Sequence, residues 1–575
     1  MIDGDKKTLP TNGTPRVLPS EADAPRHEVI LYAFGNIETA IANQFLNVIN
    51  LVMIVAMGIS PLLVGLIMGL KTLWDGVTDP VMAYITDNTR SRWGRRRPYI
   101  LVGGIAHTLF LLAVVVFFPR TTALKTNAQL EAQKQLSSTR TVIAASAPSA
   151  TNAAPLALTN VAGALASATG TQAVSALALT NTSAPSTSAL PPPHAARSKG
   201  AWRNIVEGVR AFRDPANAPQ RTVVIYMLVA ALIFTTLTTI MSVPYYALGI
   251  ELSPSYHGRT QVVTYRAAVD KIAGLIAPWV APFCFLTLFP TALDGLRWVA
   301  ILLVLIGIPA TTLMVVFIHE RTQVTTRGAS ALRLGFFRSI WYTLSNSHFL
   351  RIFVLYQFIG FTSGLFAQMG TYLNIYWVMG SAKSGTAMGA RVQLLAWALS
   401  FATLPLVNWA CRRFQKHNAL RCAIVWMSLG CLLKWWCMNP QHPEYQYLLP
   451  FFFSVGISSV SVVLSTMMAD VTDVDELRTG TRREGMFGAV MALLNKTVGS
   501  LTPVLAGIIL VAAGFDPQLP RQAPETILRL RILYSFVPAA FLLTALLVLR
   551  RYPLTAQRMA EIKAELAQRR AATCT

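Results

Sequence analysis

Charged residues are scarce in this chain of 575 residues. They make up 13% of it, whereas hydrophobic residues make up 53%, and a soluble globular domain carries about 25% charged residues. The deficit comes from long apolar runs that contain almost no charge. This pattern excludes a soluble protein and predicts one that crosses a membrane many times.

Acidic residues are scarcer than basic ones, with 26 against 49 and a formal net charge of +23. In a soluble chain this balance would favour nucleic acid as a partner. Here the Arg and Lys residues concentrate between the apolar runs, where such residues set the orientation and meet anionic lipid. We therefore expect contact with membrane lipid and no nucleic-acid partner.

Cysteine is scarce as well. The six cysteines form no CxxC pair and stand mostly in or beside apolar segments, which supports neither a zinc site nor a disulfide framework. Residues 1–27 are polar and lack the apolar core of a secretory signal, so we expect this tail to stay in the cytoplasm.

Apolar windows long enough to span a bilayer with about 20 residues are abundant. They predict an all-α integral membrane protein with twelve transmembrane helices in two six-helix bundles. The windows lie near residues 28–56, 60–86, 98–119, 222–250, 260–289, 293–318, 348–377, 385–410, 420–438, 446–469, 485–513 and 528–550.

The windows also divide the chain into parts. Basic runs such as 90–97 and the tail after Arg550 then fall on the side of both termini, which is expected to be cytoplasmic. The predicted parts are a cytoplasmic tail at 1–27, an N-terminal bundle at 28–318, a cytoplasmic linker at 319–347, a C-terminal bundle at 348–551 and a cytoplasmic tail at 552–575.

One segment departs from this plan. Residues 120–200 are rich in Ala, Ser, Thr and Pro and poor in large apolar side chains, so we expect a disordered insertion on the outer side. Apolar residues at helical spacing over 202–212 predict a short amphipathic helix on the membrane surface. The mostly polar segment 554–570 predicts a short helix on the cytoplasmic face.

Two carboxylates interrupt the second apolar window. Asp75 and Asp79 are four residues apart and therefore share one face of a helix. A charge at the centre of a bilayer costs at least about 2.5–3.5 kcal/mol, so such acids are found where they meet a cation, a partner or water. Na⁺ and protons bind to hard oxygen ligands of this kind. The alternative is that Lys71, four residues earlier, pairs with Asp75.

These residues belong to motifs that resemble a known family. The segments 74–80 (WDGVTDP), 89–98 (TRSRWGRRRP) and 468–485, together with Lys496, resemble the glycoside–pentoside–hexuronide:cation symporters, the melibiose-permease-like branch of the major facilitator superfamily. The resemblance implies the major facilitator fold and alternating access. It also implies symport of a sugar or glycoside with Na⁺ or H⁺, with no other cofactor, in a bacterial inner membrane. We expect a monomer.

The resemblance also assigns a cation site. In the family the acids of the second helix bind the coupling ion, which implies this role for Asp75 and Asp79. Thr239 stands at a family position that contributes a hydroxyl to the same site. Thr78 stands where the family has an asparagine, so the choice between Na⁺ and H⁺ stays open.

The substrate positions differ from the family pattern. Ala40 and Ser242 stand where the family has sugar-binding acids, and Tyr246 and Ser461 stand where it has sugar-stacking tryptophans. A less acidic cavity favours an uncharged or anionic sugar. The substrate-binding candidates are Arg266, Lys496, Ser242, Tyr246, Asn36 and Glu38.

Several candidates have an alternative interpretation. Arg266 and Asp270 are four residues apart and can satisfy each other, and Lys496 can pair with the acids when the cation is absent. The polar residues at 372–377 and the Lys434-Trp435-Trp436 run are typical of interfacial anchors.

Charged residues near the cytoplasmic ends predict a gate. Their ion pairs would hold the two halves together in the outward-open state and break as the halves move. The gate candidates are Asp87, Arg90, Arg92 and Arg95 in the first half and Asp470, Asp473 and Arg482 in the second.

Two other functions remain open. A lipid or drug transporter of the same fold would have a cavity that opens sideways to the bilayer rather than one lined by hydroxyls and amides. Aspartates four apart also hold Mg²⁺-diphosphate in intramembrane transferases. Those enzymes need a further acidic cluster, whereas the second acidic block here is interleaved with arginine.

Overall fold

Helices make up the regular structure of the described part of the chain. The computed structural model describes residues 23–35, 37–89, 91–119, 124–132, 206, 214, 217–253, 255–320, 341–480, 483–550, 552–554 and 556–574.

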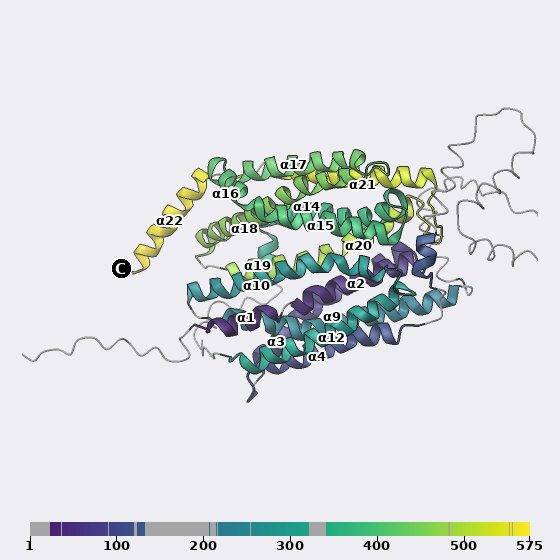
Figure 1. Ribbon diagram of the computed structural model, residues 1–575. Coiled ribbons are helices and arrows are strands. Elements are labelled where there is room, and N and C mark those ends of the chain that lie inside the picture. The colour runs from purple at the N-terminus through teal and green to yellow at the C-terminus, as the bar shows by residue number, and fades with distance from the viewer. Residues whose placement is uncertain are drawn as a thin grey trace, which may run out of the picture. The chain divides into compact units, whose positions relative to one another are not determined.

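The helices of the N-terminal bundle run side by side (Figure 1). They are α1 (Arg26–Phe34), α2 (Ile37–Val55), α3 (Pro61–Asn88), α4 (Arg97–Val116), α9 (Ala218–Glu251), α10 (Tyr256–Ile276), the short η3 (Ala277–Trp279), α11 (Val280–Cys284) and α12 (Ala292–Phe317).

The C-terminal bundle packs beside the first and ends in a helix that extends from it (Figure 1). Its elements are α14 (Ser347–Leu373), the π-helix η4 (Asn374–Val378), α15 (Ala382–Ala402), α16 (Leu404–Arg413), α17 (Lys416–Cys437), η5 (Pro443–Leu448), α18 (Leu449–Thr479), α19 (Glu484–Gly499), α20 (Leu501–Ala512), α21 (Pro524–Arg550) and α22 (Ala556–Cys574).

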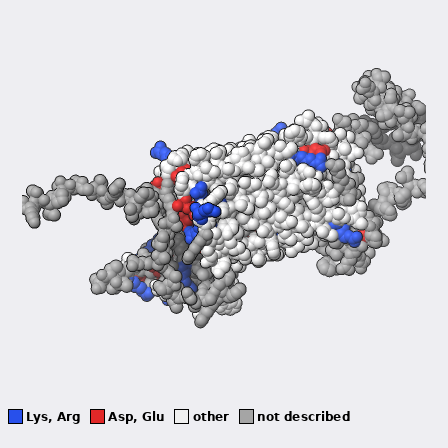
Figure 2. Space-filling model, turned by 90° about the horizontal axis from the view of Figure 1, so that it is seen from below, with Lys and Arg blue, Asp and Glu red and all other residues white. Residues whose placement is uncertain are grey.

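The prediction of an all-α membrane fold is confirmed, and each of the twelve predicted windows is helical over most of its length. Within the described residues, nine helices are long and apolar enough to cross a membrane, or ten if the bent pair α15–α16 counts as one span. The two remaining windows are the helix α2, whose apolar part (Ile41–Val55) is shorter, and α3, which carries charged side chains. Figure 2 shows charged side chains gathered toward the two ends, with a largely uncharged surface between them.

The bundles approach each other most closely at the end opposite α1 and α22, which we call the far end; the end with α1 and α22 is the terminal end (Figure 1). Helices α3 and α20 are in extensive contact. A Cβ added to Gly65 would overlap the carbonyl of Pro503, and one added to Gly507 would lie 2.6 Å from the Pro61 oxygen. Only glycine permits this close backbone approach.

A part of the segment predicted to be disordered is ordered, and the rest of residues 120–200 lies outside the described residues. Residues 124–132 are ordered, and 127–132 are helical. The Nδ2 atom of the buried Asn127 lies within hydrogen-bond distance of the carbonyls of Cys284 (3.0 Å), Leu286 (2.8 Å) and Phe289 (3.2 Å), which share its two protons. These bonds satisfy carbonyls of the turn between α11 and α12, which explains why this polar stretch is held in place.

Other predictions for the connecting segments are only partly covered by the structure. The predicted amphipathic helix at 202–212 lies outside the described residues except for Val206, and so does most of the linker at 319–347. The helix predicted at 554–570 is present as α22. Its apolar side chains Met559, Ile562 and Leu566 are buried in the core of the C-terminal bundle.

Candidate functional site

The acid pair lies on α3. The helix begins with Pro61, a residue suited to a first turn because its missing N–H would have no helical partner there. Asp75 and Asp79 are one turn apart, and their side chains are 28% and 32% exposed. Both carboxylates therefore face the same side of α3 and are partly shielded from solvent.

Helix α9 brings a hydroxyl to this pair. Thr239 Oγ1 lies 3.3 Å from Asp75 Oδ1 and 3.3 Å from Asp79 Oδ1. Its single proton can be donated to one of these oxygens at a time. Thr78 Oγ1 lies 3.2 Å from Thr239 Oγ1. The structure thus brings together the four side chains predicted to bind a cation.

The charge that faces the acids comes from the other bundle. Lys496 of α19 places Nζ 2.7 Å from Asp75 Oδ2 and also contacts Asp79 Oδ2. The ion pair joins the two bundles, because α3 and α19 belong to different halves. Asp75 therefore pairs with Lys496 and not, as one interpretation had it, with Lys71. An ammonium group stands where a coupling cation would meet both carboxylates.

The predicted substrate residues are spread over the site. The Arg266 guanidinium carbon lies 4.9 Å from the centre of the Tyr246 ring, a cation–π contact. Tyr246 and the half-buried Ser242 follow Thr239 along α9 toward the terminal end. Asn36 and the side chain of Glu38 lie outside the described residues.

The gate residues of the first half form ion pairs within their own bundle. Arg95 contacts Glu251 at 2.7 Å, and Arg96 contacts Glu251 at 2.9 Å and Asp87 at 3.4 Å. Glu320 accepts backbone hydrogen bonds from residues 95, 96 and 97. The sequence did not single out Glu251 or Glu320, since each is an isolated acid at a helix end.

The gate residues of the second half are also paired locally. Asp470 contacts Lys416 at 2.6 Å, and Asp475 contacts Arg483 at 2.7 Å. Asp473 is half-buried, Arg92 is exposed, and Arg90 and Arg482 lie outside the described residues. The ion pairs named here each join residues of one bundle. The predicted gate across the halves stays a prediction.

Lys434, which was expected to be an interfacial anchor, is buried inside the C-terminal bundle. Lys434 is 0% exposed, and its Nζ lies 4.5 Å, 4.7 Å and 4.5 Å from the ring centres of Phe366, Phe453 and Tyr534. Its Nζ has no hydrogen-bond partner within the described part of the chain. Lys434 is therefore an interior residue of the C-terminal bundle rather than an interfacial anchor, whereas its neighbour Trp436 is 64% exposed as expected.

The structure contains a cavity of about 670 Å³ whose lining residues were not predicted. It lies between the bundles and is lined by residues of α2, α3, α14, α15 and α20, among others. Lys71 and Thr72 of α3 reach it, one turn from Asp75. Arg266, Lys496, Ser242 and Tyr246 are not among its lining residues. The two buried residues Tyr372 and Asn374, expected as interfacial anchors, line it instead.

Known proteins agree with this architecture. The family model described as MFS/sugar transport protein matches residues 31–130 and 212–556. An uncharacterized symporter of Synechocystis sp. is 26% identical over 89% of this chain and 91% of its own length. The sphingosine-1-phosphate transporter MFSD2B of Mus musculus is 24% identical over 59% of this chain and 70% of its own length.

A solved structure shows the same fold. The crystal structure of a bacterial homolog of the human lysosomal transporter Spinster superposes with a TM-score of 0.56 at 12% identity, covering 92% of this chain and all of that chain. These similarities are to transporters and not to enzymes, as expected. The relatives include symporters and a glucuronide carrier homolog, which confirms the resemblance to the glycoside–pentoside–hexuronide:cation symporters. The chain belongs to the MFS/sugar transport protein family.

Proposed function

We propose that this protein is a secondary active transporter that moves a sugar or glycoside together with Na⁺ or H⁺ by alternating access. The observation that carries the proposal is the cluster between the bundles. Two carboxylates of α3 share the Thr239 hydroxyl of α9 and the Lys496 ammonium of α19. Membrane acids arranged in this way are typical of ion pathways.

In this proposal Lys496 acts as an internal cation. When no coupling ion is bound, its ammonium neutralises Asp75 and Asp79. A bound Na⁺ ion, or protons on the carboxylates, neutralises Asp75 and Asp79 in place of Lys496. The ion pair that links α3 and α19 is then released. The ion therefore changes the free-energy difference between the two arrangements of the bundles, which is the basis of coupling.

The surrounding groups take defined roles. Thr239 and Thr78 add hydroxyl oxygens to the cation site. Arg266, Tyr246 and Ser242, the substrate candidates from the sequence, lie on its terminal side and do not line the cavity. The close contact of α3 with α20 at the far end supports an arrangement that faces the terminal end, which is the cytoplasm in the predicted topology. In the opposite arrangement, Arg95 and Asp470 would exchange their local partners for partners across the halves.

The direct test is uptake by purified protein in proteoliposomes. Glycosides, pentosides and uronates are offered under imposed Na⁺ or H⁺ gradients, with the two gradients applied separately. We expect accumulation above equilibrium with one of the ions and none after collapse of that gradient. Facilitated equilibration without any accumulation would show that transport is not ion-coupled.

A lipid transporter is the second candidate, and the similarity to MFSD2B favours it. It predicts transfer of a lysolipid or sphingosine phosphate between leaflets in the same vesicles. The amide-lined cavity supports the sugar more strongly, since a lipid tail gains nothing from carboxamide groups. Lipid transfer without sugar uptake would decide for this alternative.

A further inference from the structure

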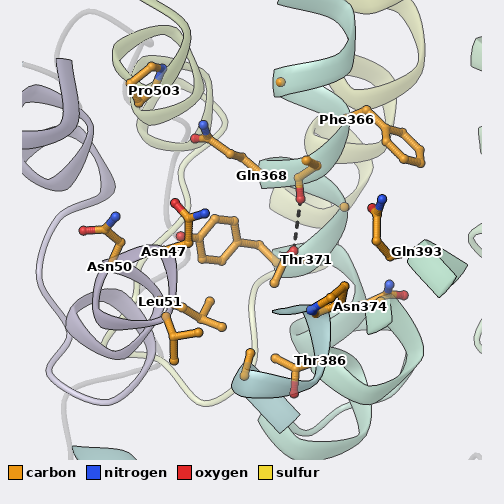
Figure 3. A pocket seen from close by; sticks show the side chains of 18 of the residues that line it. Asn47, Asn50, Leu51, Phe366, Gln368, Thr371, Asn374, Thr386, Gln393 and Pro503 are labelled. Atoms are coloured by element: carbon orange, nitrogen blue, oxygen red, sulfur yellow. Dashed lines mark hydrogen bonds between the residues drawn. The ribbon is translucent and has the colours of Figure 1, made fainter. Parts of the chain in front are cut away.

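The cavity between the bundles has the size of a small-molecule site. Its volume of about 670 Å³ lies within the range of roughly 300–1,000 Å³ that is usual for ligand pockets. Figure 3 shows Asn47 and Asn50 of α2 on one side of the cavity and Gln368 of α14 across from them. Both bundles therefore contribute to its walls, as alternating access requires of a substrate site.

The lining is rich in carboxamides and poor in charge. Asn47, Asn50, Gln368 and Gln393 all reach the cavity. A carboxamide both donates and accepts hydrogen bonds, which matches the hydroxyl groups of a sugar. Among the lining residues there is no carboxylate, and Lys71 is the one charged side chain. Lys71 precedes Asp75 by one turn of α3, and the ammonium groups of Lys71 and Lys496 balance in number the two carboxylates of Asp75 and Asp79.

Part of this hydrogen-bonding capacity is unused. Asn50 Oδ1 is buried and accepts no hydrogen bond within the described residues. By contrast, Asn374 and Gln446 satisfy each other, with Gln446 Nε2 donating to Asn374 Oδ1 at 2.8 Å. A buried acceptor without a donor costs free energy, so the Asn50 carboxamide would gain a hydrogen bond by turning its oxygen toward a ligand hydroxyl in the cavity.

An aromatic ring completes the wall. Trp397 lines the cavity and follows Gln393 by one turn of α15, so the two side chains share a helical face. Lys271 Nζ lies 4.6 Å from the Trp397 ring centre, which fixes the ring from one side. A pyranose offers hydroxyls around its edge and an apolar C–H face, and the pair of Gln393 and Trp397 provides partners for both.

We propose that this cavity is the substrate site and that it selects an uncharged sugar ring over its uronate. The inference rests on the proposed function and names the substrate class of that transporter. The amides bind the hydroxyls, Trp397 packs on the ring, and the absence of a second positive charge in the lining leaves a carboxylate poorly neutralised. Because Lys71 and Asp75 share α3, solute and ion act on the same helix.

The test measures binding and uptake by the full-length protein in lipid nanodiscs and proteoliposomes. The probes are p-nitrophenyl glucoside, p-nitrophenyl galactoside and p-nitrophenyl glucuronide. The variants Gln393→Leu and Asn50→Leu each remove one carboxamide. Asn43→Leu is the matched control, because Asn43 is an exposed amide of α2 that does not line the cavity.

We expect a neutral glycoside to bind the wild-type protein more tightly than the glucuronide. Each cavity variant should bind the neutral glycoside up to about tenfold more weakly, the cost of one lost hydrogen bond. Asn43→Leu should bind the glycoside as the wild-type protein does. Gln393 is exposed to the cavity, so its variant should fold even if Asn50→Leu does not.

Tighter binding of the glucuronide, or unchanged glycoside binding in Gln393→Leu, would overturn the inference while the proposed function stands. Failure of the wild-type protein to accumulate any probe under either ion gradient would count against the proposed function and this inference together.

Discussion

Two lysines of the C-terminal bundle are withdrawn from water in different ways. Lys496 lies between the bundles, against two carboxylates of α3. Lys434 lies inside its own bundle, surrounded by three aromatic rings, and has no hydrogen-bond partner among the described residues. In the proposed function a mobile cation takes the place of Lys496 at its two carboxylates, whereas the rings around Lys434 offer a cation no carboxylate. The difference separates a site of exchange from a structural element.

The largest effect on transport is expected when Lys496 is replaced. In Lys496→Met the carboxylates keep their place but lose the internal cation, so the empty carrier must reorient with unpaired charge. We expect net accumulation to fall about tenfold or more, in line with the cost of an unpaired charge in a membrane, while exchange of solute across the loaded carrier persists. Proteoliposome uptake and exchange, measured side by side, check this. Equal loss of both activities would contradict the role of Lys496 in the return step.

A smaller effect is expected from the contact that holds α3 against the opposite bundle. Gly65→Ala places a Cβ against the Pro503 backbone, and overpacking of this kind costs about 1–3 kcal/mol. We expect a lower thermal midpoint and slower uptake, because closure at the far end becomes unfavourable. Gly499→Ala is the matched control, since a Cβ there meets nothing within 4 Å. A similar response of both variants would show that the contact does not matter.

The smallest effect on transport is expected at Lys434. In Lys434→Met an apolar side chain of similar length replaces a buried amine, which removes the cost of burying an unsatisfied polar group, about 1–3 kcal/mol. We expect an unchanged or higher thermal midpoint and uptake close to that of the wild-type protein. A stable Lys434→Met protein without uptake would give this lysine a functional role and remove the contrast with Lys496.

The sequence predicted the acid pair more fully than the rest of the site. Spacing alone placed Asp75 and Asp79 on one face, because helical geometry is local. The approach of Thr239 came from the resemblance to a family, since no local pattern links it to residues 160 positions away. The prediction that Lys496 can pair with the acids also concerned two helices far apart in sequence, and the structure shows this contact.

Other features depend on tertiary packing and could not be predicted. Lys434 stands beside two tryptophans, as an interfacial anchor would, and its burial depends on rings that come from α14, α18 and α21. The cavity is similar. Asn47 and Asn50 are polar residues in an apolar window, a pattern that indicates a polar site within the membrane. Gln368 and Gln393 line the same cavity only because the two bundles pack together.

The central claim is that the acid pair of α3 binds the coupling ion. It is tested most directly by ion-driven uptake in Asp75→Asn and Asp79→Asn, with Glu525→Gln, an exposed acid at the start of α21, as the control. Both α3 variants are predicted to lose accumulation above equilibrium, and the control to retain it. Uphill accumulation at the wild-type level in both α3 variants would contradict the claim.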